Sequence, residues 1–531
     1  MDDLLPIYGE TFLRYVLAID DPDDPIPQEL SAHQREVASA LRQVASQAPA
    51  DPQRIGQYTH LSNLGRWQEE SGSSIANALR VHAGGELPAV PDSANPLVDH
   101  LTKVARDIWP SMLLPLPTIS PASFWHSTPI GVFVHPETIE AGKAFLRDTK
   151  LRKLFPGSPS GTAIDALNMS SLVEVNAYWT TNAGRGGTQG LMTLLGLLIS
   201  NSHLRSIMRR GRSSWEALVA EIPNTVAEMK KLANSETVDV PRSIGFLGLT
   251  VPDEVVVTLP HGTLRGLRQG DRDYLLPEST SATCIFLTTF PLRLLEIETW
   301  NPTSQIDPLS QRSSGVWEVA RADLQAAERK IDLTRLAVLL SSPEDKTWAL
   351  AQISSLIADP TSPGGISQWS AQRYGVNYGE LDDAAGGRIG AWWEILNEHH
   401  PTSLDIAMRR VLSAAGNRLD PIDGFVDAVV AWENCFGTAT ETTFRVTASL
   451  SMILEPDSGS SRLALQKRLK KLYEKRSRVV HGALQLSPQE ASLLRDEALD
   501  IAKRCLRQLY TTRTDLLGLK SEERSARVLL D

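Results

Sequence analysis

The sequence predicts a mainly α-helical protein with a central α+β region. Apolar residues recur at helical spacing in the first 115 residues and again from about residue 315. Between these parts lie short segments rich in β-branched residues, separated by Gly and Pro. At 531 residues the chain is too long for one ordinary core, so we divide it into 1–115, 116–312 and 313–531.

The N-terminal region, 1–115, is expected to be mostly helical. Linkers rich in Pro, Asp and Ser, such as 88–96 and 115–121, separate its periodic segments. Two apolar helix faces carry this prediction: Leu30, Val37, Leu41 and Val44 form the first, and Leu97, Leu101, Val104, Ala105 and Ile108 form the second.

The central region, 116–312, is expected to be mixed. Its helical middle, 191–232, precedes a series of short apolar segments that end at turn residues such as Pro260-His261-Gly262. Such segments favour strands of an antiparallel β module. The predicted strands are 244–251, 255–259, 264–268, 284–288 and 292–297.

The C-terminal region, 313–531, is expected to be a bundle of amphipathic helices with short connections. Its last long helix has a clear start signal, because Ser487 caps, Pro488 takes the first helical position and Glu490 closes a capping box. Three apolar stripes are Leu404, Ala407, Met408, Val411 and Leu412; Ile422, Phe425, Val426 and Val429; and Leu465, Leu469, Leu472, Arg476, Val479 and Val480.

Composition excludes several classes of protein. The net charge of −10 argues against coating nucleic acid over the whole surface, so any RNA contact must be local. The first residues lack a basic segment, and the longest apolar run, 190–199, is too short to span a bilayer. Three unpaired cysteines fit a reducing cytoplasm. We therefore expect a cytoplasmic protein without a membrane partner, metal site or cofactor.

The segment from Arg462 to Arg478 is strongly basic, with eight basic residues and Glu474 as its one acid. A solvated polar helix face is the ordinary explanation of such a run. The alternative is local binding of RNA phosphates. The residues expected to make that contact are Lys467, Lys470, Lys471, Lys475 and Arg478.

Arg476 and His481 have the chemistry for RNA cleavage without a metal. Arg holds phosphate through its fork of donors, and His moves protons near neutral pH. Arg476 lies on the apolar stripe, and Gly482 after His481 is a helix-stop residue. Five positions on a helix correspond to about 140°, so the pair meets only if the helix frays or a second subunit completes the site. The alternative is a structural role, in which His481 caps the helix and Arg476 fastens the helix end to its neighbours.

The segment that contains these residues resembles the Apea-like branch of the HEPN superfamily. Tyr473, Arg476-Ser477, Val479-Val480 and His481-Gly482 match its motif. Upstream, 420–433 resembles the helix of that branch that ends in an aliphatic-Glu pair, and Met408-Arg409-Arg410 resembles the preceding helix. Here Trp432 replaces the usual aliphatic residue before Glu433, which is a departure from the pattern. The resemblance covers about 400–510.

The resemblance implies a helical bundle that forms a homodimer and acts as a metal-independent endoribonuclease. In such a site His481 acts on the ribose 2′-OH or the leaving oxygen, Arg476 stabilises the phosphorane, and Ser477 belongs to the motif, where active members often carry Asn, Asp or His. The implied role is a regulated prokaryotic defence or toxin effector that cuts host RNA, with tRNA among the candidates. An unidentified trigger ligand or protein would act on the N-terminal or central region. The alternative is a non-catalytic module for dimerisation or for binding RNA or nucleotide.

Three weaker patterns favour structural explanations. The Gly-rich segment 181–190 lacks the Lys-Ser/Thr of a phosphate-binding loop and is expected to be a turn. Glu394 with His399-His400 lacks metal-ligand spacing and is expected at a helix end. A second basic cluster, Arg205, Arg209, Arg210 and Arg212, is expected to be a solvated helix end rather than an RNA contact.

Overall fold

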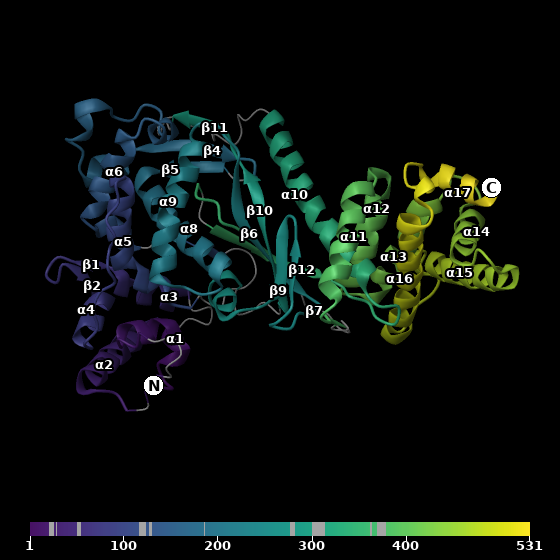
Figure 1. Cartoon of the computed structure of the whole chain (residues 1–531), viewed down its shortest axis with the longest axis horizontal. Coiled ribbons are helices and arrows are strands. Elements are labelled where there is room, and N and C mark those ends of the chain that lie inside the picture. Colours follow the sequence, from purple (N-terminus) through teal and green to yellow (C-terminus); the bar gives the residue numbers. More distant parts are fainter. Residues whose placement is uncertain are drawn as a thin grey trace.

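A computed structural model provides the fold. The structure describes residues 1–20, 26–27, 29–49, 55–115, 124–126, 130–184, 186–276, 282–299, 314–361, 364–368 and 379–530. The chain forms an elongated molecule, in which a group of helices at one end, a β-sheet in the middle and a helical bundle at the other end follow one another (Figure 1). The expected mainly helical fold with a central α+β region is confirmed at this level.

The helices of the N-terminal end enclose one large apolar core. This core includes Phe12 and Trp109, and it extends to the strand residues Val240, Phe290 and Ile357 of the middle region. The helices are α1 (Leu5–Val16), α2 (Ala32–Gln47), α3 (Ile55–Ser62), α4 (Ile75–His82), α5 (Pro96–Met112), α6 (Glu137–Arg147), α7 (Met169–Val173), α8 (Leu191–Arg210) and α9 (Trp215–Leu232). A two-stranded ribbon, β1 (Trp67–Gln68) with β2 (Ser73–Ser74), interrupts them. The N-terminal helices and the central region thus share one core.

The central sheet has seven strands in the order β3-β13-β12-β6-β10-β9-β8, and all its pairs are antiparallel. The longest ladder joins β6 and β10, from Cys284 opposite Phe246 to Leu292 opposite Val238. The strands are β3 (Phe124–His126), β6 (Val238–Leu247), β8 (Val256–Leu259), β9 (Gly262–Gly266), β10 (Cys284–Leu292), β12 (Ala351–Ile357) and β13 (Gly364–Gln368). The predicted antiparallel module therefore exists and contains additional strands, but the strand expected at 292–297 corresponds mainly to β11 (Leu294–Thr299), which belongs to a separate sheet.

Two strands of this sheet come from the part of the chain that was expected to be helical. β12 lies between β6 and β13, so the helical pattern of 313–531 is interrupted at 351–368. β12 is buried at almost every position, and therefore lacks the alternation of a half-exposed strand. The boundaries expected near 115 and 312 adjoin 116–123 and 300–313, which lie outside the described residues, and they stay predictions.

Smaller sheets complete the middle of the molecule. β11 (Leu294–Thr299), β4 (Asn176–Thr181) and β5 (Gly186–Gly190) form a three-stranded antiparallel sheet. β5 and the end of β4 come from the Gly-rich segment 181–190, whose main-chain groups take part in a β-hairpin instead of cradling a phosphate. A short parallel pair joins β7 (Leu249–Thr250) to β14 (Gly379–Glu380).

The C-terminal bundle packs on one face of the central sheet. A single apolar cluster contains Phe246 and Phe286 of the sheet together with Leu336, Trp393 and Trp432 of the helices. On the opposite face, side chains at the end of α8 contact other sheet residues. The helices are α10 (Ser314–Ser341), α11 (Ala385–His399), α12 (Asp405–Leu412), α13 (Pro421–Phe436), α14 (Thr442–Leu454), α15 (Gly459–Val480), α16 (Pro488–Thr511) and α17 (Ser521–Leu530).

Candidate functional site

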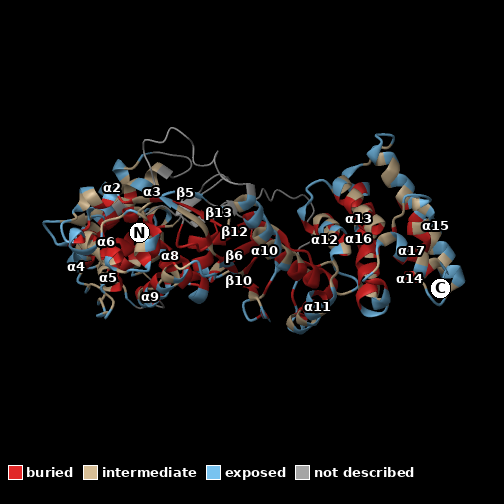
Figure 2. Ribbon diagram, turned by 90° about the horizontal axis from the view of Figure 1, so that it is seen from above, coloured by how far each residue is buried: buried red, intermediate tan, exposed pale blue. Residues whose placement is uncertain are grey.

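Helix α15 carries the basic run and the Arg476–His481 motif, and it lies on the outside of the bundle. It packs against α14 and the end of α13, and among its described residues only Leu469 and Leu472 are buried. The rest of the helix is exposed or half-exposed (Figure 2). The predicted stripe is confirmed in its middle, but Val480 is 53% exposed and does not belong to the core.

Helix α15 ends at the position that Gly482 predicts. This glycine has φ of +69°, a conformation that costs little without a Cβ. Gly482 N–H donates to the Val479 carbonyl over 3.0 Å, and Ala483 N–H donates to the Arg478 carbonyl over 2.8 Å. This pair of bonds is a Schellman motif. The helix is therefore continuous through Val480, and His481 sits at its cap.

Arg476 points inward and meets two residues that also belong to the family-like pattern. Its Nη2 lies 3.4 Å from Glu433 Oε2 of α13, and the Tyr473 hydroxyl donates to Glu433 Oε1 over 2.5 Å. The Arg476 side chain is 21% exposed and that of Glu433 25%. The two segments that carry the resemblance, 420–433 and 473–482, thus meet at one carboxylate.

The Arg476 guanidinium retains unused donors. Its Nε is buried and has no hydrogen-bond partner among the described residues. The contact with Glu433 is a single one of 3.4 Å, whereas a fully engaged Arg–carboxylate pair usually makes two shorter bonds. An arginine held loosely in a half-buried position can still accept a phosphate oxygen as partner.

Tyr473 supports this cluster but is unsuited to move protons. Its partial burial, together with its hydrogen bond to Glu433, raises the pKa of the phenol to about 12. The hydroxyl therefore stays protonated near neutral pH and keeps donating to the carboxylate. In this cluster an imidazole is a better candidate for a general base than a phenol.

His481 and Ser477 lie near Arg476 in sequence, but the helix separates their side chains. His481 is exposed, and its main-chain N–H donates to the Ser477 carbonyl over 3.1 Å. No hydrogen bond joins Arg476 to His481 in the described part of the chain. With the helix unbroken between them, their directions differ by about 140°. A single chain therefore presents an inward Arg and an outward His.

Four basic residues of α15 occupy a different face from Arg476. On a helical projection Lys467, Lys471, Lys475 and Arg478 fall within roughly 80°, and Arg476 lies roughly 100° or more from each. These four are exposed and form no ion pair with other described residues. Two neighbours are engaged: Lys470 lies 3.9 Å from Glu474, and Arg468 forms a two-pronged ion pair with Glu497 of α16.

The other polar clusters predicted from sequence are mostly tied to the fold. Arg205 pairs with Glu228 and donates to the Ala358 carbonyl, and Arg209 pairs with Glu221. His400 Nε2 lies 3.0 Å from Asp405 Oδ1, and its Nδ1 is 2.5 Å from the Tyr510 hydroxyl. His400 therefore joins α12 to α16. Within the described ranges, no group of His, Cys, Asp and Glu has the arrangement of a metal site.

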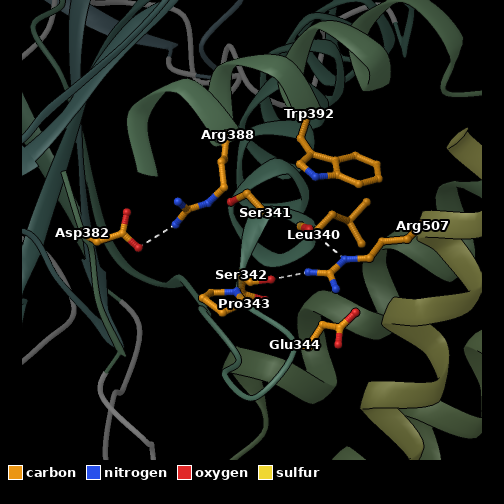
Figure 3. Close-up of a pocket in the computed structure, with 9 residues that line it drawn as sticks. All are labelled: Leu340, Ser341, Ser342, Pro343, Glu344, Asp382, Arg388, Trp392 and Arg507. Carbon is orange, nitrogen blue, oxygen red and sulfur yellow. Dashed lines mark hydrogen bonds and ion pairs between the residues drawn. The ribbon is translucent and has the colours of Figure 1, made fainter. Parts of the chain in front are cut away.

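A cavity of about 430 Å³ lies where α10, α11 and α16 meet (Figure 3). Its charges are largely satisfied from within. Arg388 pairs with Asp382 over 2.7 Å, and Arg507 donates to the carbonyl oxygens of Leu340, over 2.9 Å, and Ser342. Arg507 thus caps the C-terminus of α10, and Figure 3 shows both guanidinium groups turned toward these partners. This cavity has a structural explanation.

Comparisons with known proteins found no family model that matches the chain, and no curated protein or solved structure similar to it. The membership suggested by Tyr473, Arg476, His481 and the 420–433 segment therefore stays a prediction. None of the helices in the described ranges combines the length and the apolar character that a membrane span requires.

Proposed function

We propose that the chain is a metal-independent endoribonuclease that works as a homodimer through its C-terminal bundle. One observation carries this proposal. The two segments with family-like residues converge on Glu433, and they leave Arg476 half-buried with an unpartnered Nε next to an exposed basic helix. A surface arginine that served only solubility would have no need of this inward position.

The proposed reaction uses two imidazoles and one guanidinium. A neutral His481 removes the proton from a ribose 2′-OH, and the 2′ oxygen then forms a bond to phosphorus. The bond from phosphorus to the 5′ oxygen breaks, and a protonated second His481 gives its proton to that oxygen. Arg476 stabilises the phosphorane charge. The products carry a 2′,3′-cyclic phosphate and a 5′-hydroxyl.

Dimerisation supplies the second imidazole. One chain has an inward Arg476 and a single outward His481, so it lacks the second imidazole that the reaction needs. A two-fold axis near the end of α15 would bring the partner's His481 toward Arg476, because isologous contacts place identical residues close together. The exposed apolar side chain of Val480, the last residue of α15, suits such a contact.

A non-catalytic module for binding RNA is the second candidate. It is favoured by the ion pair between Arg476 and Glu433, which already offsets part of the arginine charge. The two candidates differ in their products. A binding module retards RNA in a gel without shortening it, whereas a nuclease of this kind yields 5′-hydroxyl ends that polynucleotide kinase labels directly.

The deciding experiment treats defined RNA with the purified chain in EDTA and sequences the ends. We expect cleavage to continue without added metal, with cyclic phosphate and 5′-hydroxyl ends, and to stop in His481→Ala. Leu463→Ala, at an exposed position of the same helix, serves as the matched control. Strict dependence on Mg²⁺ or Mn²⁺, or equal cleavage by His481→Ala, would contradict the proposal.

Self-association is tested separately by light scattering across a dilution series. We expect specific activity per chain to fall as the dimer dissociates. Adding an excess of His481→Ala to the unchanged chain should lower activity more than dilution does, because a mixed dimer holds one imidazole where the reaction needs two. Full activity of a strictly monomeric chain would contradict the shared site.

A further inference from the structure

A second cavity, of about 500 Å³, lies at the junction of α10, α12 and the single π-helical turn Ser413–Asn417. This volume is within the range of small-molecule sites. Three arginines and one carboxylate are among its charged lining residues, in contrast to the balanced pairs of the cavity at α16. The lining residues are Asp332, Arg335, Ile406, Arg409, Arg410, Leu412, Ser413 and Asn417.

The back wall of this cavity is rigid. Arg335 is 4% exposed and donates to Asp332 Oδ1 over 2.9 Å, to the Leu350 carbonyl over 2.9 Å and to Asn417 Oδ1 over 2.8 Å. These bonds use all three of its nitrogen atoms and fix Asp332 and Asn417 at the same time. The polar groups of the wall are therefore positioned before any ligand arrives.

At the mouth of the cavity, the arginine side chains outnumber the carboxylates that pair with them. Arg410 and Arg418 share one buried carboxylate, Asp427, at 2.5 and 2.6 Å. Arg418 also lies 3.8 Å from Asp423, which is a weak exposed contact. Arg409 is exposed, and its Nε donates only to the Asp405 carbonyl, over 3.3 Å, among the described residues. At the rim, Arg409 therefore forms no ion pair with another described residue, and Arg410 shares its carboxylate with a second arginine.

An apolar edge lies beside these cations. Ile406 is 48% exposed, although it lines the cavity next to the buried Leu412. An arginine fork matches the oxygens of a phosphoryl group, and an exposed aliphatic surface matches the flat face of an organic group attached to it. A simple inorganic anion would leave most of the cavity and its apolar edge unused.

We propose that this cavity binds a phosphomonoester, that is, a terminal phosphoryl group attached to an organic moiety of mononucleotide size. Arg409 and Arg410 hold the phosphoryl oxygens, and Ile406 contacts the organic part. The phosphoryl group can belong to a free mononucleotide or to the 5′ end of an RNA strand. This site is separate from the Arg476 cluster and does not depend on nuclease activity.

The test is calorimetric titration of the full chain with five probes: adenosine 5′-monophosphate, adenosine, inorganic phosphate, a short RNA with a 5′-phosphate, and the same RNA with a 5′-hydroxyl. We expect the monophosphate to bind more tightly than inorganic phosphate and adenosine not to bind. Tighter binding of the 5′-phosphate RNA than of the 5′-hydroxyl RNA, without binding of the monophosphate, would assign the phosphoryl group to an RNA end. Absence of binding by every phosphorylated probe would overturn the proposal.

Two variants locate the site without disturbing the fold. Arg409→Gln removes an exposed guanidinium, and Ile406→Glu places a negative charge on the apolar edge; both residues are exposed, so thermal unfolding should be unchanged. Arg409→Gln should weaken binding about tenfold or more, since a hydrogen bond to a charged group typically contributes that much. Ile406→Glu should weaken binding at least as much, because its carboxylate repels the phosphoryl group. Arg388→Gln, in the other cavity, is the matched control. Equal weakening by Arg388→Gln would overturn the location.

Discussion

Helices α13 and α15 belong to the same bundle and carry the two halves of the family-like pattern, but they differ sharply in burial. Nine residues of α13 are buried, including Phe425 and Trp432, whereas α15 is longer and buries Leu469 and Leu472 among its described residues. Packing explains the composition of α13. Packing does not explain most of the residue types in α15, because few of its side chains are buried.

This contrast in burial determines which variants can separate function from folding. Residues of α13 such as Asp427 and Trp432 are held by several neighbours, so their loss would damage the fold. Residues on the outer face of α15 can change without creating cavities or unpaired buried groups. Variants in the two helices should therefore separate effects on RNA from effects on stability.

The largest effect is expected for His481→Ala. Loss of the proton carrier should lower RNA cleavage by a factor of roughly 10²–10⁴, while the melting temperature stays that of the unchanged chain, because the side chain is exposed. Single-turnover cleavage and thermal unfolding on the same preparation measure both. A variant that loses stability together with activity would assign His481 to the fold.

Trp432→Ala is the counterpart on α13. The indole is 1% exposed, and its Nε1 donates to the Ala498 carbonyl over 3.1 Å. Truncation should lower the free energy of unfolding by about 3–5 kcal/mol. Urea unfolding measures this, with Lys471→Ala on α15 as the control, for which a change within about 0.5 kcal/mol is expected. Similar losses of unfolding free energy in both variants would contradict the predicted difference between the two helices.

Arg476→Ala should lower turnover by roughly 10²–10³ and RNA binding little, as expected for a group that acts mainly in the transition state. Arg476→Lys should restore little of the lost turnover, because the point charge of a lysine cannot reproduce the planar fork of an arginine. Binding by filter retention and single-turnover rates distinguish the two effects. If binding fell as much as turnover, Arg476 would be a simple RNA contact.

The smallest effect per residue is expected on the outer basic face. Replacing Lys467, Lys471 and Lys475 together by Gln should weaken RNA binding evenly across sequences and lower the salt slope by about 2. Replacing the exposed Lys150, Lys153 and Lys231 of the N-terminal end gives the same change in net charge and is the control. Equal losses in both triple variants would show a general charge effect.

Several parts of this organisation could be read from the chain because they depend on local rules. The capping box of Ser487 and Glu490 is present, and the helix stop at Gly482 is a Schellman motif. The inward position of Arg476 followed from its place among Leu469 and Leu472 on one helix face. In each case the local structure is determined by residues within a few helical turns in the sequence.

Other parts depend on contacts between distant segments. Periodicity cannot show that Arg476 meets Glu433, 43 positions earlier, because that depends on how α13 and α15 pack. Nor can it show that β12 enters the central sheet, since a strand covered on both faces has no alternating pattern. The cavity at Arg335 and Arg409 also remained hidden, because its residues come from three elements.

The position of β12 between β6 and β13 has a consequence for synthesis of the chain. β6, β8, β9 and β10 leave the ribosome before β12, which follows about 60 residues after β10; this takes roughly 3–12 s at usual rates of translation. During that interval one edge of β6 has no neighbour and is open to other chains. The helices α11–α17, with Arg476 and His481, emerge only after β12 has been made, so the proposed cleaving end of the molecule is completed last.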